Sequence, residues 1–145
     1  MAGDKGAVFD SDLLKLILNG TTIAGIAENV PVPATQFYLS LHTADPGASG
    51  DQTTSEATYP GYSRMPVPRS TAGFTVTGTV ALLTTTVDFV VCQTWASAET
   101  ETWAAVGMAS TGAGKILYRG PITPTIQVVS GVGPQLAAGS KITES

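Results

Sequence analysis

The residues best suited to catalysis are the single histidine and the hydroxyl and carboxyl groups near it. Ser40 and Asp45 each lie within three positions of His42 along the chain. A hydrolase of this kind would use Ser40 as the nucleophile and His42 as its base. The G-x-S-x-G turn that presents such a serine in α/β hydrolases is absent from the sequence. We therefore interpret His42 as a histidine on the polar face of a strand, and predict that the chain is not an enzyme.

Acidic residues suggest two other chemistries. Glu99 and Glu101 could form the carboxyl pair of a glycosidase, but they stand between Trp95 and Trp103 in a segment that looks like a polar turn. We expect both carboxylates to be solvated there. A second acidic group lacks the spacing of an EF-hand and predicts no calcium site. Its members are Asp45, Asp51 and Glu56.

Cysteine and glycine motifs are equally uninformative about chemistry. The single cysteine, Cys92, excludes an intramolecular disulfide and a Cys-rich zinc site, so we expect a small core residue. Gly112–Lys115 resembles part of a phosphate-binding loop, but Ile116 stands where a magnesium-binding hydroxyl is required. A glycine hairpin between two strands is the preferred interpretation. The sequence thus predicts no catalytic residue, metal site or cofactor.

Composition narrows the class of protein further. The chain has 145 residues, of which 43% are hydrophobic and only 12% charged, about half the usual charged fraction. Seven basic against eleven acidic residues argue against direct nucleic-acid binding. No apolar run approaches the length of a membrane span, and the first residues lack the pattern of a secretory signal. Stability must come from packing, within the chain or against another chain.

The N-terminal part is expected to form an arm and a short helix. Residues 1–9 are small and polar and predict an arm. Residues 11–19 follow helical spacing, with Ser11 or Asp10 as the cap and Asn19-Gly20 as the stop. Four apolar residues form one face of this helix, which is too short to be stable unless it docks. They are Leu13, Leu14, Ile17 and Leu18.

The rest of the chain predicts short strands. Gln36–Thr43 alternates with period two, and a polar loop from Asp45 to Tyr59 follows it. Tyr62–Arg69 also alternates but contains Pro66 and Pro68, so it is expected at a sheet edge. The remaining strand predictions are Phe74–Thr77, Val80–Leu83, Val87–Cys92, Trp103–Ala109, Ile116–Tyr118, Thr125–Val129 and part of Gln135–Ile142.

This pattern predicts an all-β fold. We expect a jelly-roll-like β-sandwich of about eight short strands with one short N-terminal helix and extended termini. Residues 10–145 are expected to form a single β-rich domain behind the arm. The C-terminal extension is expected at Lys141–Ser145.

Several blocks of the sequence resemble a family of small virion proteins of tailed bacteriophages. One block is similar to the family's "LYLSLHTADPG" strand, another to its "GYAR" element, and a third to its "GIGTASSGAGKLLY" hairpin. The matching blocks are Leu13–Gly20, Phe37–Gly47, Gly61–Arg64, Gly107–Tyr118 and Val128–Gly139. Members of this family are often labelled tail-fibre proteins by similarity. The resemblance implies a jelly-roll-like capsid cement or decoration protein.

The resemblance also implies partners and a location. We expect binding to the major capsid protein on the outer face of the capsid, where the protein would stabilise the shell, and a homodimer or trimer. The low charge suits interfaces, whose cores are depleted in charged residues, and arginine suits fork-like pairs with carboxylates. The candidate interface residues are Phe9, Leu13, Leu14, Ile17, Arg64, Arg69 and Arg119.

The same sequence also permits an alternative function. The chain could be a tail-associated or fibre module that binds a glycan on the host surface. Trp95, Trp103 or Tyr59 would then lie at the binding site. A small hydrolase that uses His42 and Ser40 is a third hypothesis, which a loss of activity in His42→Ala would support.

Overall fold

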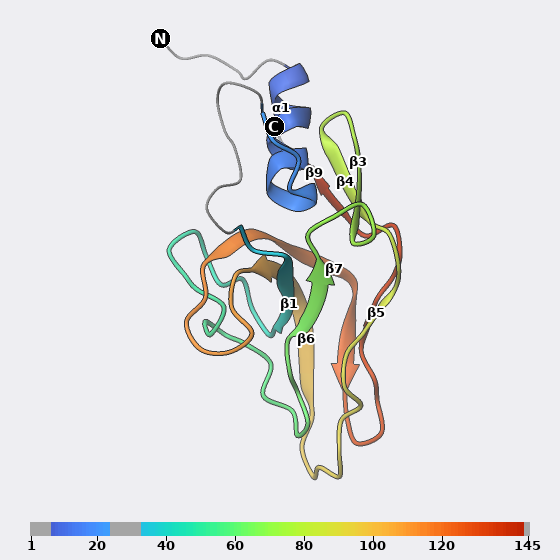
Figure 1. The fold of residues 1–145 in the computed structure, drawn as a ribbon. Coiled ribbons are helices and arrows are strands. Elements are labelled where there is room, and N and C mark those ends of the chain that lie inside the picture. The colour runs from blue at the N-terminus through green and yellow to red at the C-terminus, as the bar shows by residue number, and fades with distance from the viewer. Residues whose placement is uncertain (1–6, 24–32, 144–145) are drawn as a thin grey trace. The chain divides into compact units, whose positions relative to one another are not determined.

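The computed structural model describes residues 7–23 and 33–143. By its contacts the chain forms two compact units: unit 1 (Met1–Gln36, Pro68–Thr86 and Ala137–Ser145) and unit 2 (Phe37–Val67 and Val87–Leu136). The described residues hold one N-terminal helical segment and nine strands in antiparallel sheets (Figure 1). The predicted all-β class with one short N-terminal helix is confirmed. The single domain over residues 10–145 stays a prediction.

The helix of unit 1 starts earlier than the sequence predicts. α1 (Ala7–Leu14) is helical four positions before the expected start at Ser11. Ala7–Phe9 therefore belongs to the helix, and its assignment to the arm was wrong. Asp10 lies in the first turn of this longer helix, where a carboxylate interacts favourably with the helix dipole, rather than at the cap. The rest of the predicted arm, residues 1–6, lies outside the described residues.

An arginine caps the other end of the helix. α1 continues into a π-helical segment, η1 (Lys15–Asn19), which ends at Gly20 with a φ of 69° that favours glycine. Arg69 donates from Nε to the carbonyl of Ile17 at 2.5 Å, and from Nη2 to the carbonyl of Leu16. The positive guanidinium therefore interacts favourably with the partial negative charge of the carbonyls at the C-terminal end of the helix.

Unit 1 also contains a three-stranded sheet. Its order is β3 (Phe74–Thr77), β4 (Val80–Leu83) and β9 (Lys141–Thr143), all antiparallel. The expected bounds of β3 and β4 are confirmed. We expected Lys141–Ser145 to form an extension, but Lys141–Thr143 is a strand of this sheet. Its backbone pairs with β4, where Thr143 lies opposite Val80.

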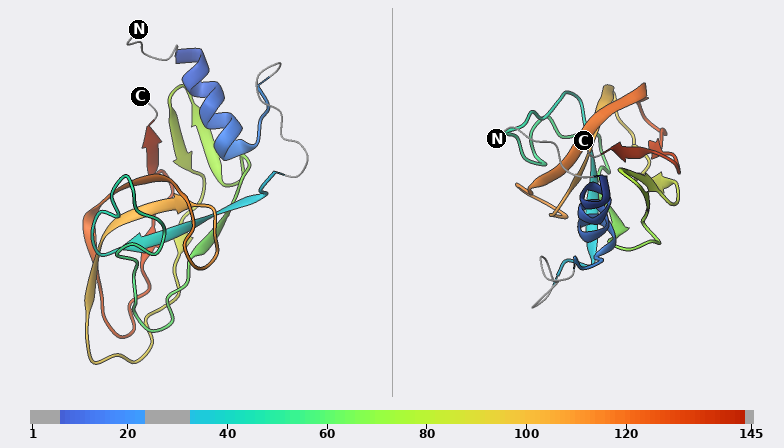
Figure 2. Two further views of the ribbon diagram at one scale, coloured as in Figure 1. Left: turned by 90° about the vertical axis from the view of Figure 1, so that its left-hand side faces the viewer. Right: turned by 90° about the horizontal axis from the view of Figure 1, so that it is seen from above.

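The helix docks on this sheet through its apolar face, as expected. α1 contacts β3 and β4, and Figure 2 shows it beside these two strands. Leu14 and Leu18 are completely buried. On the sheet, Phe74 of β3 and Ala81 of β4 are each at most 1% exposed. Asn19 adds a hydrogen bond from Nδ2 to the carbonyl of Phe74 at 2.7 Å. Packing of this kind provides most of the stability of a short helix.

Unit 2 carries a four-stranded sheet in the order β2-β1-β6-β7. β1 pairs antiparallel with β6 from Tyr38↔Gly107 to His42↔Trp103. The proline-containing strand β2 lies at the edge next to β1, which confirms the expectation for Pro66 and Pro68. The strand bounds are β1 (Gln36–His42), β2 (Met65–Pro68), β6 (Glu99–Gly107) and β7 (Ile116–Val128).

Three strand predictions in unit 2 need correction. β6 begins at Glu99 instead of Trp103, and β7 joins the two strands expected at Ile116–Tyr118 and Thr125–Val129. A bulge makes this possible, because Trp103 pairs with Pro121 while Glu101 pairs with Ile126. Pro124 lies among the β7 residues that this bulge leaves unpaired. Its missing N–H group therefore removes no hydrogen bond between the strands.

The expected strand Val87–Cys92 is much shorter in the structure. Only Val87–Asp88 is a strand, β5, which pairs with β8 (Gln135–Leu136). The expected segment Gln135–Ile142 is accordingly divided between β8 in unit 2 and β9 in unit 1. The glycine hairpin predicted at Gly112–Lys115 is confirmed, since it connects β6 and β7.

A buried glutamine explains two glycines of this hairpin. Gln52 is fully buried, accepts at Oε1 from the amide of Ala109 at 3.0 Å, and donates from Nε2 to the carbonyl of Tyr38 at 3.3 Å. A Cβ at Gly107 or at Gly114 would lie 2.1 Å from an atom of the Gln52 side chain. Both positions therefore require glycine for the close approach of this side chain.

Gly114→Ala is expected to destabilise the protein by about 1–3 kcal/mol, because the added methyl group overpacks the Gln52 site. Gly120→Ala is the matched control, since a Cβ there meets no atom within 4 Å. Urea unfolding monitored by circular dichroism measures both free energies of unfolding. Equal stabilities for the two variants would contradict the packing role of Gln52.

Candidate functional site

The strongest polar contact in unit 2 is a fork-like ion pair between Arg64 and Glu56. Nε donates to Oε1 at 2.6 Å and Nη2 to Oε2 at 2.8 Å, with side-chain exposures of 2% for Arg64 and 17% for Glu56. Arg64 also donates to the carbonyls of Ala109 at 3.0 Å and Gly112 at 2.8 Å. The guanidinium thus joins the loop after β1 to the hairpin between β6 and β7. Its donors are used inside the unit rather than at a surface.

Tyr62 extends this network to the central strand. Its hydroxyl donates to Oε1 of Glu56 at 3.0 Å and accepts from the amide of Leu41 at 3.1 Å. Burial raises the pKa of Tyr62 far above its ordinary value, so the phenol stays neutral. The element Gly61–Arg64 is one of the blocks that resemble the phage virion family. It supplies two side chains that fasten the loop to β1.

Ser40 and His42 are adjacent but covered. Both are completely buried, with Oγ of Ser40 2.9 Å from Nε2 of His42. Nδ1 of His42 lies 2.9 Å from the carbonyl of Thr54 and donates to it, so Nε2 accepts from the serine hydroxyl. Burial lowers the pKa of His42, which keeps the ring neutral. The pair holds the loop residue Thr54 to β1.

Asp45, the third member of the hypothetical triad, lies elsewhere. Its Oδ1 accepts from Nε of Arg119 at 2.7 Å and from the amide of Gly47 at 2.8 Å. The bond from Arg119 holds the pKa of this carboxyl below its ordinary value. Both side chains of the pair are partly exposed, so the contribution to stability is small.

The carboxyl pair of the hypothetical glycosidase is also inside the fold. Glu101 is completely buried and Glu99 is half-buried, so the expectation of two solvated carboxylates in a polar turn was wrong. The reason is that both residues belong to β6. The backbone amides of Thr58 and Tyr59 donate to Oε1 of Glu99, at 2.9 and 2.8 Å.

The candidate interface residues on the helix divide between core and surface. Leu14 is completely buried, Leu13 and Ile17 are half-buried, and Phe9 is 40% exposed. Val8, which the sequence analysis did not select, is the most exposed large apolar residue described, at 77%. Its position directly before Phe9 was the available signal. Val8 and Phe9 together are called the helix-tip surface below.

A second exposed apolar group lies in unit 2. Val90, Val91 and Val129 are 38%, 54% and 38% exposed, and we call them the valine patch. The two segments that carry it are joined by hydrogen bonds from the amide of Cys92 to the carbonyl of Val132, and from the amide of Gly131 to the carbonyl of Cys92, each at 2.8 Å. Sequence reasoning missed the patch because it placed these residues in a strand.

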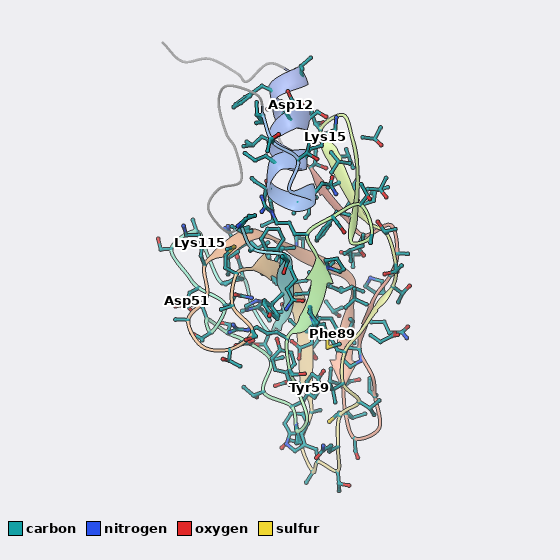
Figure 3. The ribbon with its side chains drawn as sticks, in the orientation of Figure 1. Asp12, Lys15, Asp51, Tyr59, Phe89 and Lys115 are labelled. Carbon is teal, nitrogen blue, oxygen red and sulfur yellow. The ribbon has the colours of Figure 1, made fainter. Side chains whose placement is uncertain are left out.

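The aromatic residues of the glycan hypothesis are only partly accessible. Tyr59 is 1% exposed and donates from its hydroxyl to the carbonyl of Val90 at 3.0 Å. Trp95 and Trp103 are half-buried. Cys92 is a free, buried thiol, as expected. Figure 3 labels Tyr59, together with Asp51 and Lys115 of the loops.

The described residues contain neither a metal-binding cluster nor a membrane-spanning helix. In residues 7–23 and 33–143, no group of three or more His, Cys, Asp or Glu side chains is placed to hold a metal ion. In the same ranges, no helix has the length and apolar character required to cross a membrane.

Arg64→Ala is expected to destabilise the protein by about 3–5 kcal/mol, because Glu56 would stay in a mostly buried position without its partner. Arg119→Ala removes the exposed ion pair with Asp45 and should cost much less, because solvent screens an exposed pair. Thermal and urea unfolding of the two variants test the difference. An Arg64→Ala variant as stable as Arg119→Ala would contradict the structural role of the buried pair.

Comparison with known families gives one match of high coverage. The family described as podophage GP4 fiber I protein gp80 has a model that matches residues 8–143. The match runs from α1 to β9 and so includes both units. No curated protein matches the chain significantly. Because the matched range is nearly the whole sequence, the chain belongs to this family of tailed-phage virion proteins, and it is a structural phage protein.

Proposed function

We propose that the protein is a building block of a fibre-type appendage of a tailed-phage virion. The observation that carries this proposal is the match of residues 8–143 to a family whose description names a fibre protein. The match extends through both units, so it concerns the whole folded part of the chain rather than one motif.

The distribution of polar groups supports an assembly role. Arg64, Arg69 and Glu56 make their contacts within their own units, where they fasten loops and a helix end. Large apolar side chains stand at the surface instead, in the helix-tip surface and the valine patch. Exposed apolar residues on a small domain mark contact sites for other proteins, and interface cores are poor in charge.

We propose that these contacts are made with other virion subunits, including copies of this chain, and that the protein has no catalytic activity of its own. Ser40 and His42, the groups with the best geometry for nucleophilic catalysis, are both completely buried. Subunit symmetry would add the free energies of many small contacts in one particle.

A capsid cement protein on the outer face of the major capsid shell is the second candidate. The resemblance of Phe37–Gly47 and Gly107–Tyr118 to small virion proteins of tailed phages, which we take to imply a decoration role, favours it, as does the low charge. The same helix-tip surface would then contact the major capsid protein. The location in the particle separates the two candidates.

Electron cryo-microscopy and gold labelling of intact virions test the location. The proposal predicts that antibodies against this chain label the tail-associated fibres and leave the capsid faces unlabelled. Label over the capsid shell alone would overturn it in favour of the cement role. Antibodies against the major capsid protein provide the control for access to the shell.

The variant Val8→Ser/Phe9→Ser is expected to reduce the number of copies per virion at least about tenfold, because loss of the apolar contact removes more than about 1.4 kcal/mol. Met108→Ser, at an apolar residue that is 43% exposed and lies outside both surfaces, controls for loss of exposed apolar surface in general and should have a smaller effect. Quantitative immunoblots of purified particles measure the copy number, and circular dichroism checks the fold. Unchanged incorporation of the double variant would rule out the helix-tip surface as the attachment site.

A further inference from the structure

Glu101 is a carboxyl group without a donor. It is completely buried in β6, and no N–H or O–H group of the described residues donates to either of its oxygens. Its cross-strand partner on β7 is the apolar Ile126. Glu99 lies two residues earlier on the same face of β6. A buried carboxylate that no donor reaches is costly, so the fold favours the protonated form of Glu101.

Glu99 also fastens the segment that covers the pair. Its carboxylate accepts from the amide of Thr58 at 2.9 Å, from the hydroxyl of Thr58 at 2.9 Å and from the amide of Tyr59 at 2.8 Å. The Tyr59 ring contacts the edge of Tyr62 at a centroid distance of 5.3 Å, and Tyr62 stacks on Phe89 at 6.4 Å. Tyr59 and Phe89 are labelled in Figure 3. Glu99 thus connects β6 to an aromatic cluster of unit 2.

We propose that Glu99 and Glu101 form a proton-controlled latch: while Glu101 is protonated, Glu99 holds Thr58–Tyr59 against β6, and loss of the proton loosens this hold. Ionised Glu101 would repel Glu99 inside the fold, with no cation among the contacts described for either carboxyl group. Loss of the three bonds to Glu99 would let Thr58 move away and admit water, while the Tyr59 hydroxyl keeps its bond to the carbonyl of Val90. The latch is a property of unit 2 and does not depend on where the protein lies in the virion.

The groups around the pair increase the cost of ionisation. Glu99 faces Glu101 from β6, Tyr59 faces it from the covering segment, and Cys92 lies beside Tyr59 and Glu99. Burial, followed by the charge of Glu99, raises the pKa of Glu101 from 4.5 to about 8. Burial also raises the pKa values of Tyr59 and Cys92, so both stay protonated over this range. Among the residues that the structure describes, no cationic group acts on Glu101.

The sign of the pH dependence follows from this direction. The closed latch keeps its proton up to about pH 8, whereas an opened, solvated Glu101 would lose it near 4.5. Opening therefore releases a proton between these values, and the opening equilibrium rises by up to about tenfold per pH unit. Above about pH 8 the closed form is ionised too, and the dependence levels off.

Hydrogen exchange of the full-length protein tests the latch. Mass spectrometry of peptides that cover residues 58–64, corrected for the intrinsic exchange rate, should show opening that increases from pH 5 to 8 and then levels off. Glu101→Gln carries no titratable proton and should give a flat profile. Asp88→Asn, which removes an exposed carboxylate of the same unit, should behave as the wild type. A flat wild-type profile, or one that Glu101→Gln leaves unchanged, would overturn the proposal.

Infrared spectroscopy tests the protonation of Glu101 on the wild type alone. With ¹³C-labelled glutamate, the C=O stretch of a protonated carboxylic acid should be present at pH 6 and disappear as the pH rises through about 8. This measurement decides the question even if Glu101→Gln does not fold. Absence of the protonated band at pH 6 would show that Glu101 is ionised and that no latch exists.

Discussion

The structure of unit 2 depends on the buried ion pair between Arg64 and Glu56. The guanidinium binds a carboxylate of the loop after β1 and two carbonyls of the hairpin between β6 and β7. These loops have little regular secondary structure, so an arginine with five donors replaces the ladder that they lack. Removal of one member leaves a buried charge, whereas the intact pair contributes mainly to a unique arrangement of the loops.

The same use of charge explains why so little of it is left for the surface. Arg69 serves the end of the helix in unit 1, and Glu101 is completely buried in β6. In a chain with seven basic and eleven acidic residues, these internal roles remove charge from the exterior. Apolar residues such as Val8 and Val91 stand at the surface in their place. A protein of this kind is suited to contact with other subunits of a particle.

Local patterns predicted the regular parts of the fold well. β3 and β4 have the expected bounds, and the prolines of β2 correctly indicated an edge strand, because these features depend on side-chain alternation and on backbone donors. The errors lie where pairing between residues distant in the sequence sets the ends of a strand. β6 starts early because it pairs with the end of β7, and the expected strand Val87–Cys92 ends at Asp88 because β8 is only two residues long.

The sequence by itself determined the β class, the apolar helix, the absence of an intramolecular disulfide bond and the resemblance to tailed-phage virion proteins, since composition and local motifs are sufficient for these conclusions. Tertiary structure alone decided which polar residues are internal. Arg64 looked like an interface residue and Glu101 like a solvated one, yet both are covered by segments distant in the sequence. Burial is a property of the neighbours that the folded chain brings together, and a residue's own type and local spacing do not encode it.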